Sequence, residues 1–189
     1  MNAEESSSLV NKCLIATPSI KDPLFASSLV YMCEHNENGS MGLVVNHETT
    51  QSLEEVFEQL DIKCSDRKIL DQPVYIGGPV HLQQGFILHT DAGDWQRSSE
   101  ISSGIYLTSS MDILEAIANR RGPEEYLVIL GCSGWDSGQL ESELQENSWL
   151  TSAASVDLLF HQSPDNKWQM AFDTLGFDIN MLSPVSGNA

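Results

Sequence analysis

Two apolar, β-branched segments on either side of a turn sequence constrain this fold more than any other feature of the chain. They occupy residues 29–33 and 41–45, and Asn36-Glu37-Asn38-Gly39 lies between them. An Asn-Gly step between two such segments is the strongest short-range signal of a β-hairpin, because both residues tolerate the positive φ that a tight turn demands. The sequence therefore predicts a hairpin within 27–46. A hairpin by itself specifies no chemistry.

The rest of the pattern interleaves strands and helices irregularly. Further strands are predicted at 13–17, 74–76, 86–89, 105–108 and 126–130. The last of these is apolar throughout, as expected for a central strand covered on both faces. Helices are predicted at 52–61, 110–121, 139–146 and 164–175. This order favours an α+β class over a doubly wound parallel sheet.

Local signals set the ends of several elements. Ser52 and Glu55 form a capping box at the start of the first helix. Gly122 is expected to end the second helix in the left-handed conformation. We expect 66–72 to be a polar linker and 131–135 to turn between the central strand and the acidic helix at 139–146. The glutamates of that helix are expected to face mostly outward.

Charge is the most informative bulk property of the chain. Nine Lys and Arg oppose 27 Asp and Glu, which gives a formal net charge of −18. Residues 122–166 include no Lys or Arg but eight acids. Such a surface repels phosphate backbones and anionic membranes. Direct nucleic-acid binding and membrane binding are therefore disfavoured.

The length of 189 residues suits one domain. We expect this domain to cover 13–182, between flexible tails at 1–12 and 183–189. No apolar run approaches the roughly 20 residues of a membrane span, and the acidic N-terminus does not resemble a signal peptide, so we expect a cytoplasmic protein.

The cysteines form no CxxC pair and are expected to be reduced thiols of the core; they are Cys13, Cys33, Cys64 and Cys132.

Two cysteine-containing patterns fall short of a reactive site. Cys132 and Ser133 lie between a strand and a helix, where hydrolase nucleophiles occur, but the G-x-S-x-G elbow needs a glycine where this chain has Trp135. Cys33 and His35 alternate on one strand and could both face a metal ion. A zinc site needs three or four ligands, however, and the spacing of the other histidines supplies none. No metal site is predicted.

The Gly77-Gly78-Pro79 step after a strand could present backbone amides to an anion. Neither a GxGxxG pattern nor a phosphate-binding lysine accompanies it, and the nearest basic residues are Lys68 and Arg97. A tight turn stiffened by proline explains the step better. The sequence therefore predicts no cofactor.

Several segments taken together resemble one family. The N-terminal signature of the AlgH/YqgE family of bacterial proteins is similar to P-S-I-K-D-P-L-F-A-S-S-L-V-Y-M-C-E-H-N-E-N-G-S-M-G-L-V-V-N, which begins at Pro18. The later blocks follow in the same order and spacing over about 14–182: Gly77-Gly78-Pro79-Val80, G-F-I-L-H at 85–89, T-S-S-M-D-I-L at 108–114, G-C-S-G-W at 131–135, G-Q-L-E-S-E-L at 138–144 and N-S-W-L at 147–150.

This resemblance implies a single α+β domain with two central β-sheets, mixed and including the hairpin, flanked by helices. It implies no established catalytic residue and no cofactor. Some members of the family carry a transcriptional-regulator label. Cys132-Ser133 departs from the aromatic residue and alanine that are common in the family, which argues against Cys132 as a shared nucleophile.

Two hypotheses of function follow, besides direct DNA binding, which the charge opposes. The first is a non-enzymatic regulatory or interaction protein that binds a protein partner. The second is a small-molecule-binding protein or an unrecognised enzyme, with its site where turns at strand ends approach each other. The residues of that site would be His35, Asn36, Asn46, Gly77, Gly78, Cys132, Gly134 and Trp135. The absence of a convergent catalytic set favours the first hypothesis.

Overall fold

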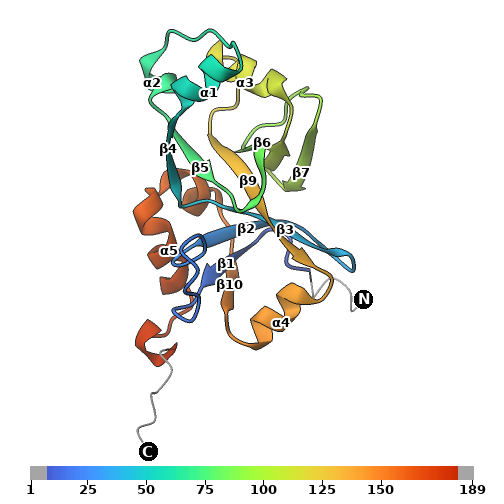
Figure 1. The fold of residues 1–189 in the computed structure, drawn as a ribbon, viewed down its shortest axis with the longest axis vertical. Helices are drawn as coiled ribbons and strands as arrows, with labels where there is room; N and C mark the ends of the chain where they lie inside the picture. The colour runs from blue at the N-terminus through green and yellow to red at the C-terminus, as the bar shows by residue number, and fades with distance from the viewer. Residues whose placement is uncertain (1–7, 183–189) are drawn as a thin grey trace, which may run out of the picture.

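The computed structural model describes residues 8–182, and its strands form one curled sheet with helices around it (Figure 1). The strands are β1 Lys12–Ala16, β2 Leu29–Asn36, β3 Gly39–Val44, β4 Glu48–Ser52, β5 Pro73–Ile76, β6 Val80–His89, β7 Ser98–Ser102, β8 Ile105–Thr108, β9 Tyr126–Asp136 and β10 Trp149–Ala153. The helices are α1 Leu53–Gln59, α2 Arg67–Leu70, α3 Met111–Ala118, α4 Gln139–Gln145 and α5 Pro164–Asp173. A π-helix, η1 Asp157–His161, and a 3-10 helix, η2 Ile179–Leu182, complete the order.

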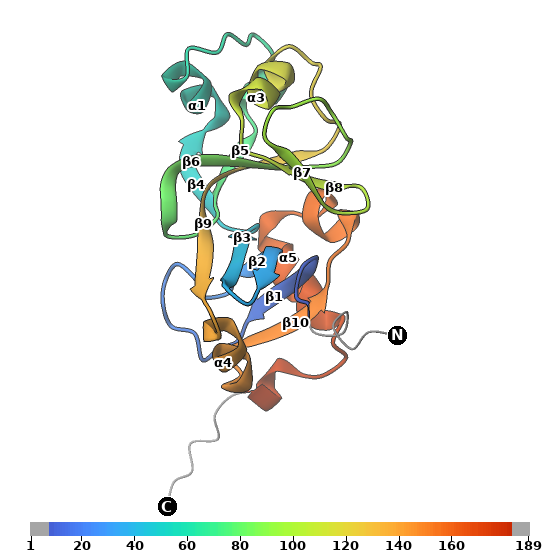
Figure 2. The same cartoon turned by 90° about the vertical axis from the view of Figure 1, so that its right-hand side faces the viewer.

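The expectation of two central sheets is corrected to one sheet of ten strands, in the order β10-β1-β2-β3-β9-β6-β8-β7, with β5 and β4 added beside β9. The reason is the length of β9, which has 11 residues. Its first part pairs parallel with β5 and antiparallel with β6, and its last part pairs antiparallel with β3. Figures 1 and 2 show β9 crossing from one half of the molecule into the other. We call β10, β1, β2 and β3 the hairpin half and β4 to β8 the far half, and β9 runs through both.

Residues 131–135, expected to form a turn, continue β9 instead. Gly131 has a φ of +71°, and opposite it β6 makes a long bulge between Val80 and Gly85. One irregular residue in a strand reverses which face the following side chains occupy. Leu127 and Ile129 accordingly belong to one core cluster, whereas Trp135 belongs to another on the opposite face.

Three apolar clusters hold the layers together. The inner cluster lies on the concave side of the sheet and draws on both halves, with Tyr31 from β2 and Leu88 from β6, and it is closed by Phe172 of α5. A second cluster packs α1 and α3 against the outer face of the far half. A third packs α4 and the 17–28 loop against the outer face of the hairpin half. The sheet thus has helices on both faces, as Figure 2 shows.

The predicted hairpin is confirmed as β2 and β3, in which Asn36 faces Gly39 across a two-residue turn. Gly39 has a φ of +140°, in the region that favours glycine. Asn38, for which a positive φ was also expected, does not have one. The turn is held instead by the Asn36 side chain, which accepts a hydrogen bond from the Asn38 amide at 2.8 Å.

Other differences from the sequence expectations are local. The linker at 66–72 contains the short helix α2, which Asp66 caps by accepting from the Lys68 amide at 3.0 Å. Arg120, with a φ of +57°, takes the left-handed position that was expected for Gly122. The amide of Arg121 then donates to the Ala116 carbonyl at 2.8 Å, which closes α3 two residues earlier.

The capping box at the start of α1 is confirmed, and it gives a stability prediction. Ser52 accepts a hydrogen bond from the Glu55 amide, and Glu55 accepts one from the Ser52 amide. Ser52→Ala should lower the free energy of unfolding by about 1 kcal/mol, measured by urea denaturation. Ser163→Ala is the matched control, because Ser163 precedes α5 without a side-chain capping bond. Equal losses in both variants would contradict a specific role for the box.

The residues just before β1 belong to the folded domain. The expected tails at 1–7 and 183–189 lie outside the described residues. Residues 8–12 belong to the expected N-terminal tail, but Leu9 packs against the third cluster and the Asn11 amide donates to the Met32 carbonyl at 2.9 Å. Within 8–182, no helix has the length and apolar character needed to cross a membrane.

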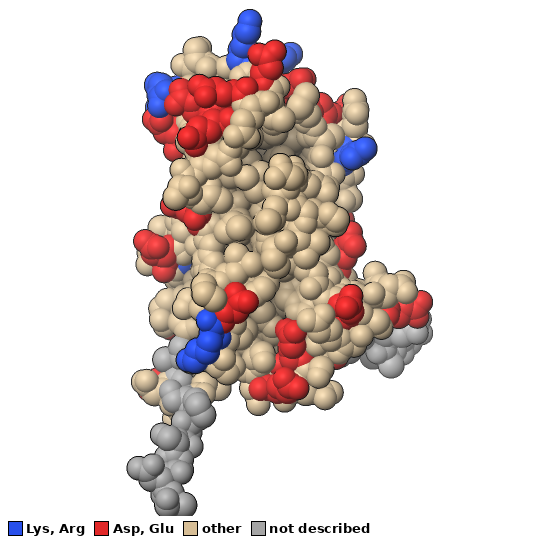
Figure 3. Space-filling model, viewed as in Figure 1, with Lys and Arg blue, Asp and Glu red and all other residues tan. Residues whose placement is uncertain are grey.

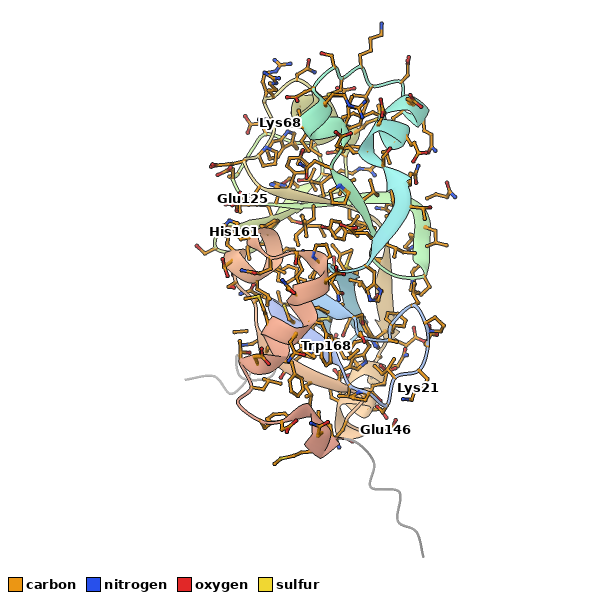
Figure 4. All side chains as sticks on the ribbon, turned by 90° about the vertical axis from the view of Figure 1, so that its left-hand side faces the viewer. Lys21, Lys68, Glu125, Glu146, His161 and Trp168 are labelled. Carbon is orange, nitrogen blue, oxygen red and sulfur yellow. The ribbon has the colours of Figure 1, made fainter. Side chains whose placement is uncertain are left out.

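Figure 4 shows how the C-terminal segment is attached to the far half. His161, at the end of η1, lies against Glu125, which precedes β9, and both contact each other as an ion pair when the histidine is protonated. The hydrogen bond to Glu125 raises the pKa of His161. From α5, Trp168 donates its indole N–H to the Ala16 carbonyl of β1 at 3.0 Å. The segment after β10 therefore contacts both halves of the sheet.

Candidate functional site

The Gly77-Gly78 step packs against β9 rather than opening toward a ligand. A Cβ on Gly78 would lie 2.4 Å from the carbonyl carbon and oxygen of Cys132. The Gly77 carbonyl accepts hydrogen bonds from the Val44 amide at 3.0 Å and from the Ser133 hydroxyl at 2.9 Å. These glycines allow two backbone segments to approach closely, and Ser133 serves that packing.

The Cys132 thiol lacks the features of a nucleophile. It is 4 % exposed, and burial, followed by the nearby Glu34, raises its pKa above the usual range. A reactive cysteine needs the opposite shift, because the thiolate is the attacking form. All four cysteines are free, and three of them are buried, as expected for thiols of the core.

His35, Asn36 and Asn46 hold the two ends of the hairpin. His35 Nδ1 lies 2.8 Å from the Ser40 hydroxyl on β3, and its Nε2 lies 3.5 Å from a carboxylate oxygen of Glu141 on α4. Asn46, beyond the other end of β3, accepts from the Leu29 amide at 2.8 Å and donates to the Ser27 carbonyl at 2.9 Å. Each of these side chains has a local structural partner.

Gly134 and Trp135 lie in the last part of β9. Trp135 is 6 % exposed and donates its indole N–H to Glu143 Oε2 at 3.0 Å. The Trp149 indole of β10 donates to the same oxygen at 2.8 Å. The expectation that Glu143 faces solvent is therefore corrected: α4 turns this carboxylate toward two buried indoles.

The structure places the eight predicted site residues in separate groups. Gly78 packs against Cys132, and Gly77 packs against the neighbouring Gly131. His35 and Asn36 lie in β2, separated from Gly134 and Trp135 by β3. Asn46 is at the opposite end of the hairpin. Within 8–182, no three side chains of His, Cys, Asp or Glu come together as a metal site requires.

A cavity of about 490 Å³ lies elsewhere, in a groove between α1, α3 and the bulge of β6. Its lining is neutral. The polar members are Gln51, Gln59, Gln83, Ser109 and Ser110, and the apolar members are Val56, Leu60, Leu82, Ile87, Met111, Leu114, Val128 and Leu130 with Gly85. Cavities of this size, lined by apolar side chains with a few polar groups among them, are typical of binding sites.

Three apolar side chains of the groove are exposed although they come from distant parts of the sequence. Leu60 is 39 % exposed, Leu82 52 % and Met111 48 %, and they follow α1, lie in the β6 bulge and begin α3. Large exposed apolar side chains that converge on one site mark an interaction surface. Sequence reasoning missed this groove because each residue belongs to an element whose other apolar residues face the core.

The surroundings of the groove carry charges of both signs. Figure 3 shows a hollow in the upper part of a largely uncharged face, with Asp and Glu, and Lys and Arg among them, gathered toward the end that α1 and α2 occupy. Glu58 on α1 and Glu115 on α3 are exposed next to lining residues. The exposed Arg97 lies on the other side, where its backbone is hydrogen-bonded to the lining residues Ser109 and Ser110. A ligand of this site would meet neutral side chains inside, carboxylates beside α1 and α3, and a positive charge at Arg97.

A buried lysine is a second feature that the sequence reasoning missed. Lys167 of α5 is 1 % exposed. Its Nζ donates to the Val45 carbonyl at 2.9 Å and lies 5.2 Å from the centroid of the Tyr75 ring. Burial lowers the pKa of Lys167 from 10.5 to about 8. The signal was available, since 167 precedes Ala171 by one helical turn on the inward face of α5.

Comparison with known proteins identifies the family. The family described as AlgH-like matches residues 13–180 of the chain. A UPF0301 protein of Thioalkalivibrio sulfidiphilus is 47 % identical over 184 residues, which are 97 % of this chain and 98 % of that protein. A UPF0301 protein of Xanthomonas campestris is 47 % identical over 181 residues, 96 % of each chain.

Solved structures agree with this result. The solution structure of the AlgH protein from Pseudomonas aeruginosa is 38 % identical, covers 100 % of both chains and superposes with a TM-score of 0.81. The crystal structure of DIP2367 from Corynebacterium diphtheriae, 18 % identical over 92 % of this chain and 90 % of that one, shares the fold with a TM-score of 0.70. With the matching motifs and the curled sheet, these likenesses establish that the chain belongs to the AlgH-like family of UPF0301 proteins.

Proposed function

We propose that this protein is a non-enzymatic regulatory protein of the cytoplasm, and that it acts by binding a partner protein in the groove between α1, α3 and the β6 bulge. The partner presents an apolar segment with Lys or Arg on the side that faces α1 and α3. The observation that carries the proposal is the convergence of Leu60, Leu82 and Met111, all exposed, on a cavity of about 490 Å³.

Charge selects the kind of partner. The lining has no charged side chain, so the part of the partner that enters the groove must be neutral to avoid burying an unpaired charge. The exposed carboxylates on α1 and α3 favour a basic residue on the side of the segment that faces these helices, whereas Arg97 disfavours one on the other side. The net charge of −18 opposes direct DNA binding, so any effect on transcription would pass through the partner.

Leu82→Lys tests this proposal, because it places a positive charge in the groove without touching the core. We expect it to weaken partner binding at least tenfold through repulsion of the basic partner and burial of an unpaired charge. The tagged chain is used to capture proteins from a bacterial lysate, and the binding of each purified candidate is then measured by calorimetry.

Met181→Lys is the matched control, because Met181 is 79 % exposed and lies in η2, outside the groove. A partner with a basic, apolar binding segment that binds the parent chain and Met181→Lys but not Leu82→Lys supports the proposal. Partners that bind all three chains equally, or an acidic binding segment, would refute it.

A further inference from the structure

A second, smaller cavity of about 310 Å³ lies over the outer face of the hairpin half, and three aromatic rings line it. Phe25 comes from the 17–28 loop, Trp135 from β9 and Trp149 from β10. The rings of Phe25 and Trp149 are 5.9 Å apart at 85°, and those of Trp135 and Trp149 are 6.0 Å apart at 80°. Rings at these distances and angles pack edge to face against one another, and together they form one aromatic wall of the cavity.

Glu143 is the only ionisable side chain in the lining of this cavity. Its Oε2 accepts both indole N–H groups, at 3.0 and 2.8 Å, and its Oε1 accepts from the Gln139 side-chain amide at 2.9 Å. All three donors are neutral. Among the described residues, no Lys, Arg or His lies within 4.0 Å of this carboxylate. The protein thus fixes a negative charge beside the aromatic rings and supplies no cation to balance it.

We infer that this cavity, the Glu143 pocket, binds a small organic ammonium ion. Aromatic rings attract cations through the negative potential of their faces, and enclosing rings favour alkylated ammonium groups in particular. The carboxylate adds a direct charge interaction. The overall negative charge of the protein raises the local concentration of cations. The volume is at the lower end of ligand sites, which limits the ligand to a small molecule.

The same features exclude other ligand classes. An anion would be repelled by Glu143, and a purely apolar ligand would cover the carboxylate without balancing its charge. A metal ion would have a single carboxylate and no further charged ligand in the lining, fewer than metal sites use. The pocket shares no lining residue with the groove of the proposed function, so either site can fail its test alone.

Choline chloride is a suitable probe, and 3,3-dimethylbutan-1-ol, its uncharged isostere, is the control ligand. Both are titrated into the ¹⁵N-labelled full chain, and the indole N–H resonances of Trp135 and Trp149 are followed by NMR. We expect choline to shift both resonances in a saturable manner, with the isostere binding at least tenfold more weakly. Equal binding of the two, or no shift with choline at millimolar concentration, would overturn the inference.

Glu143→Gln separates charge from structure, because the glutamine oxygen can still accept the two indole N–H groups. We expect choline affinity to fall at least tenfold in this variant. Glu146→Gln is the matched control: Glu146 lies at the end of the same helix (Figure 4), is exposed and does not line the pocket. Retained choline binding in Glu143→Gln, or equal loss in both variants, would refute the role of Glu143. If Glu143→Gln does not fold, Phe25→Leu, which removes one aromatic wall, must show the loss.

Discussion

Gly77→Ala is expected to destabilise the protein by about 3 kcal/mol, at the upper end of the range for an added methyl group in a packed site. A Cβ on Gly77 would lie 2.4 Å from the Gly131 carbonyl oxygen and 2.6 Å from Cγ2 of Ile129. The backbone cannot move away freely, because the Gly77 amide donates to the Leu130 carbonyl at 2.8 Å. Urea denaturation followed by circular dichroism measures the change in the free energy of unfolding.

Gly85→Ala is the matched control for this substitution. Neither Gly77 nor Gly85 has a φ in the left-handed region, and a Cβ on Gly85 would meet no atom within 4 Å. The alanine there should change stability by less than about 1 kcal/mol, and in the stabilising direction if its backbone is compatible. The difference between the two variants therefore reports the close approach alone. Equal midpoints would show that the turn relaxes around the added methyl group.

Lys167 should make the protein more stable as the pH rises from 7 to 10, relative to a Lys167→Met variant. The unfolded chain holds this proton up to about pH 10.5, whereas burial lowers the pKa of Lys167 in the folded state to about 8. Between these values the unfolded state binds more protons, so stability increases with pH. The gain over this range is about 2 to 3 kcal/mol, from about 1.4 kcal/mol for each unit of pKa shift. Below pH 8 this gain in stability is absent, because Lys167 is then protonated in the folded state as well and its charge is buried.

The measurement is the difference in unfolding free energy between the parent and Lys167→Met at each pH, under reducing conditions. Taking the difference removes the opposite effect of buried thiols on which Lys167 does not act, such as Cys33, whose pKa burial raises. Lys21→Met, on the exposed 17–28 loop (Figure 4), controls for the loss of one positive charge. If the unfolding free energies of the parent and Lys167→Met changed with pH in the same way, the ammonium group of Lys167 would have to be in contact with water.

The elements that could be predicted from the sequence are those whose signals are local. The hairpin follows from the turn sequence at 36–39, and α1 follows from the capping box of Ser52 and Glu55, because each signal acts within a few residues. The strands β4 and β7 escaped prediction since they are polar: β4 reads E-T-T-Q-S and β7 reads S-S-E-I-S. Both pair with a single neighbour at an edge of the sheet. Few of their side chains are buried there, so their sequences lack the apolar alternation that predicts a strand.

The candidate sites were harder to predict for a related reason. The groove takes Leu60, Leu82 and Met111 from three elements that meet only in the folded chain. The Glu143 pocket depends on the reversal of side-chain direction at Gly131, which turns Trp135 to the outer face. Small residues at 131–134 are compatible with a turn as well as with a strand, and only pairing with β3 decides between them. Of the predicted site residues, Gly134 and Trp135 line a cavity, and the others have structural contacts.

The strand β9, which is shared by both halves of the sheet, determines how the protein unfolds. It supplies hydrogen-bonding partners to β5 and β6 at one end and to β3 at the other, so neither half can lose it and keep its own core covered. Pulling it out would expose apolar surface on both sides of the molecule at once. We therefore expect the two halves of the sheet to unfold together in one cooperative transition.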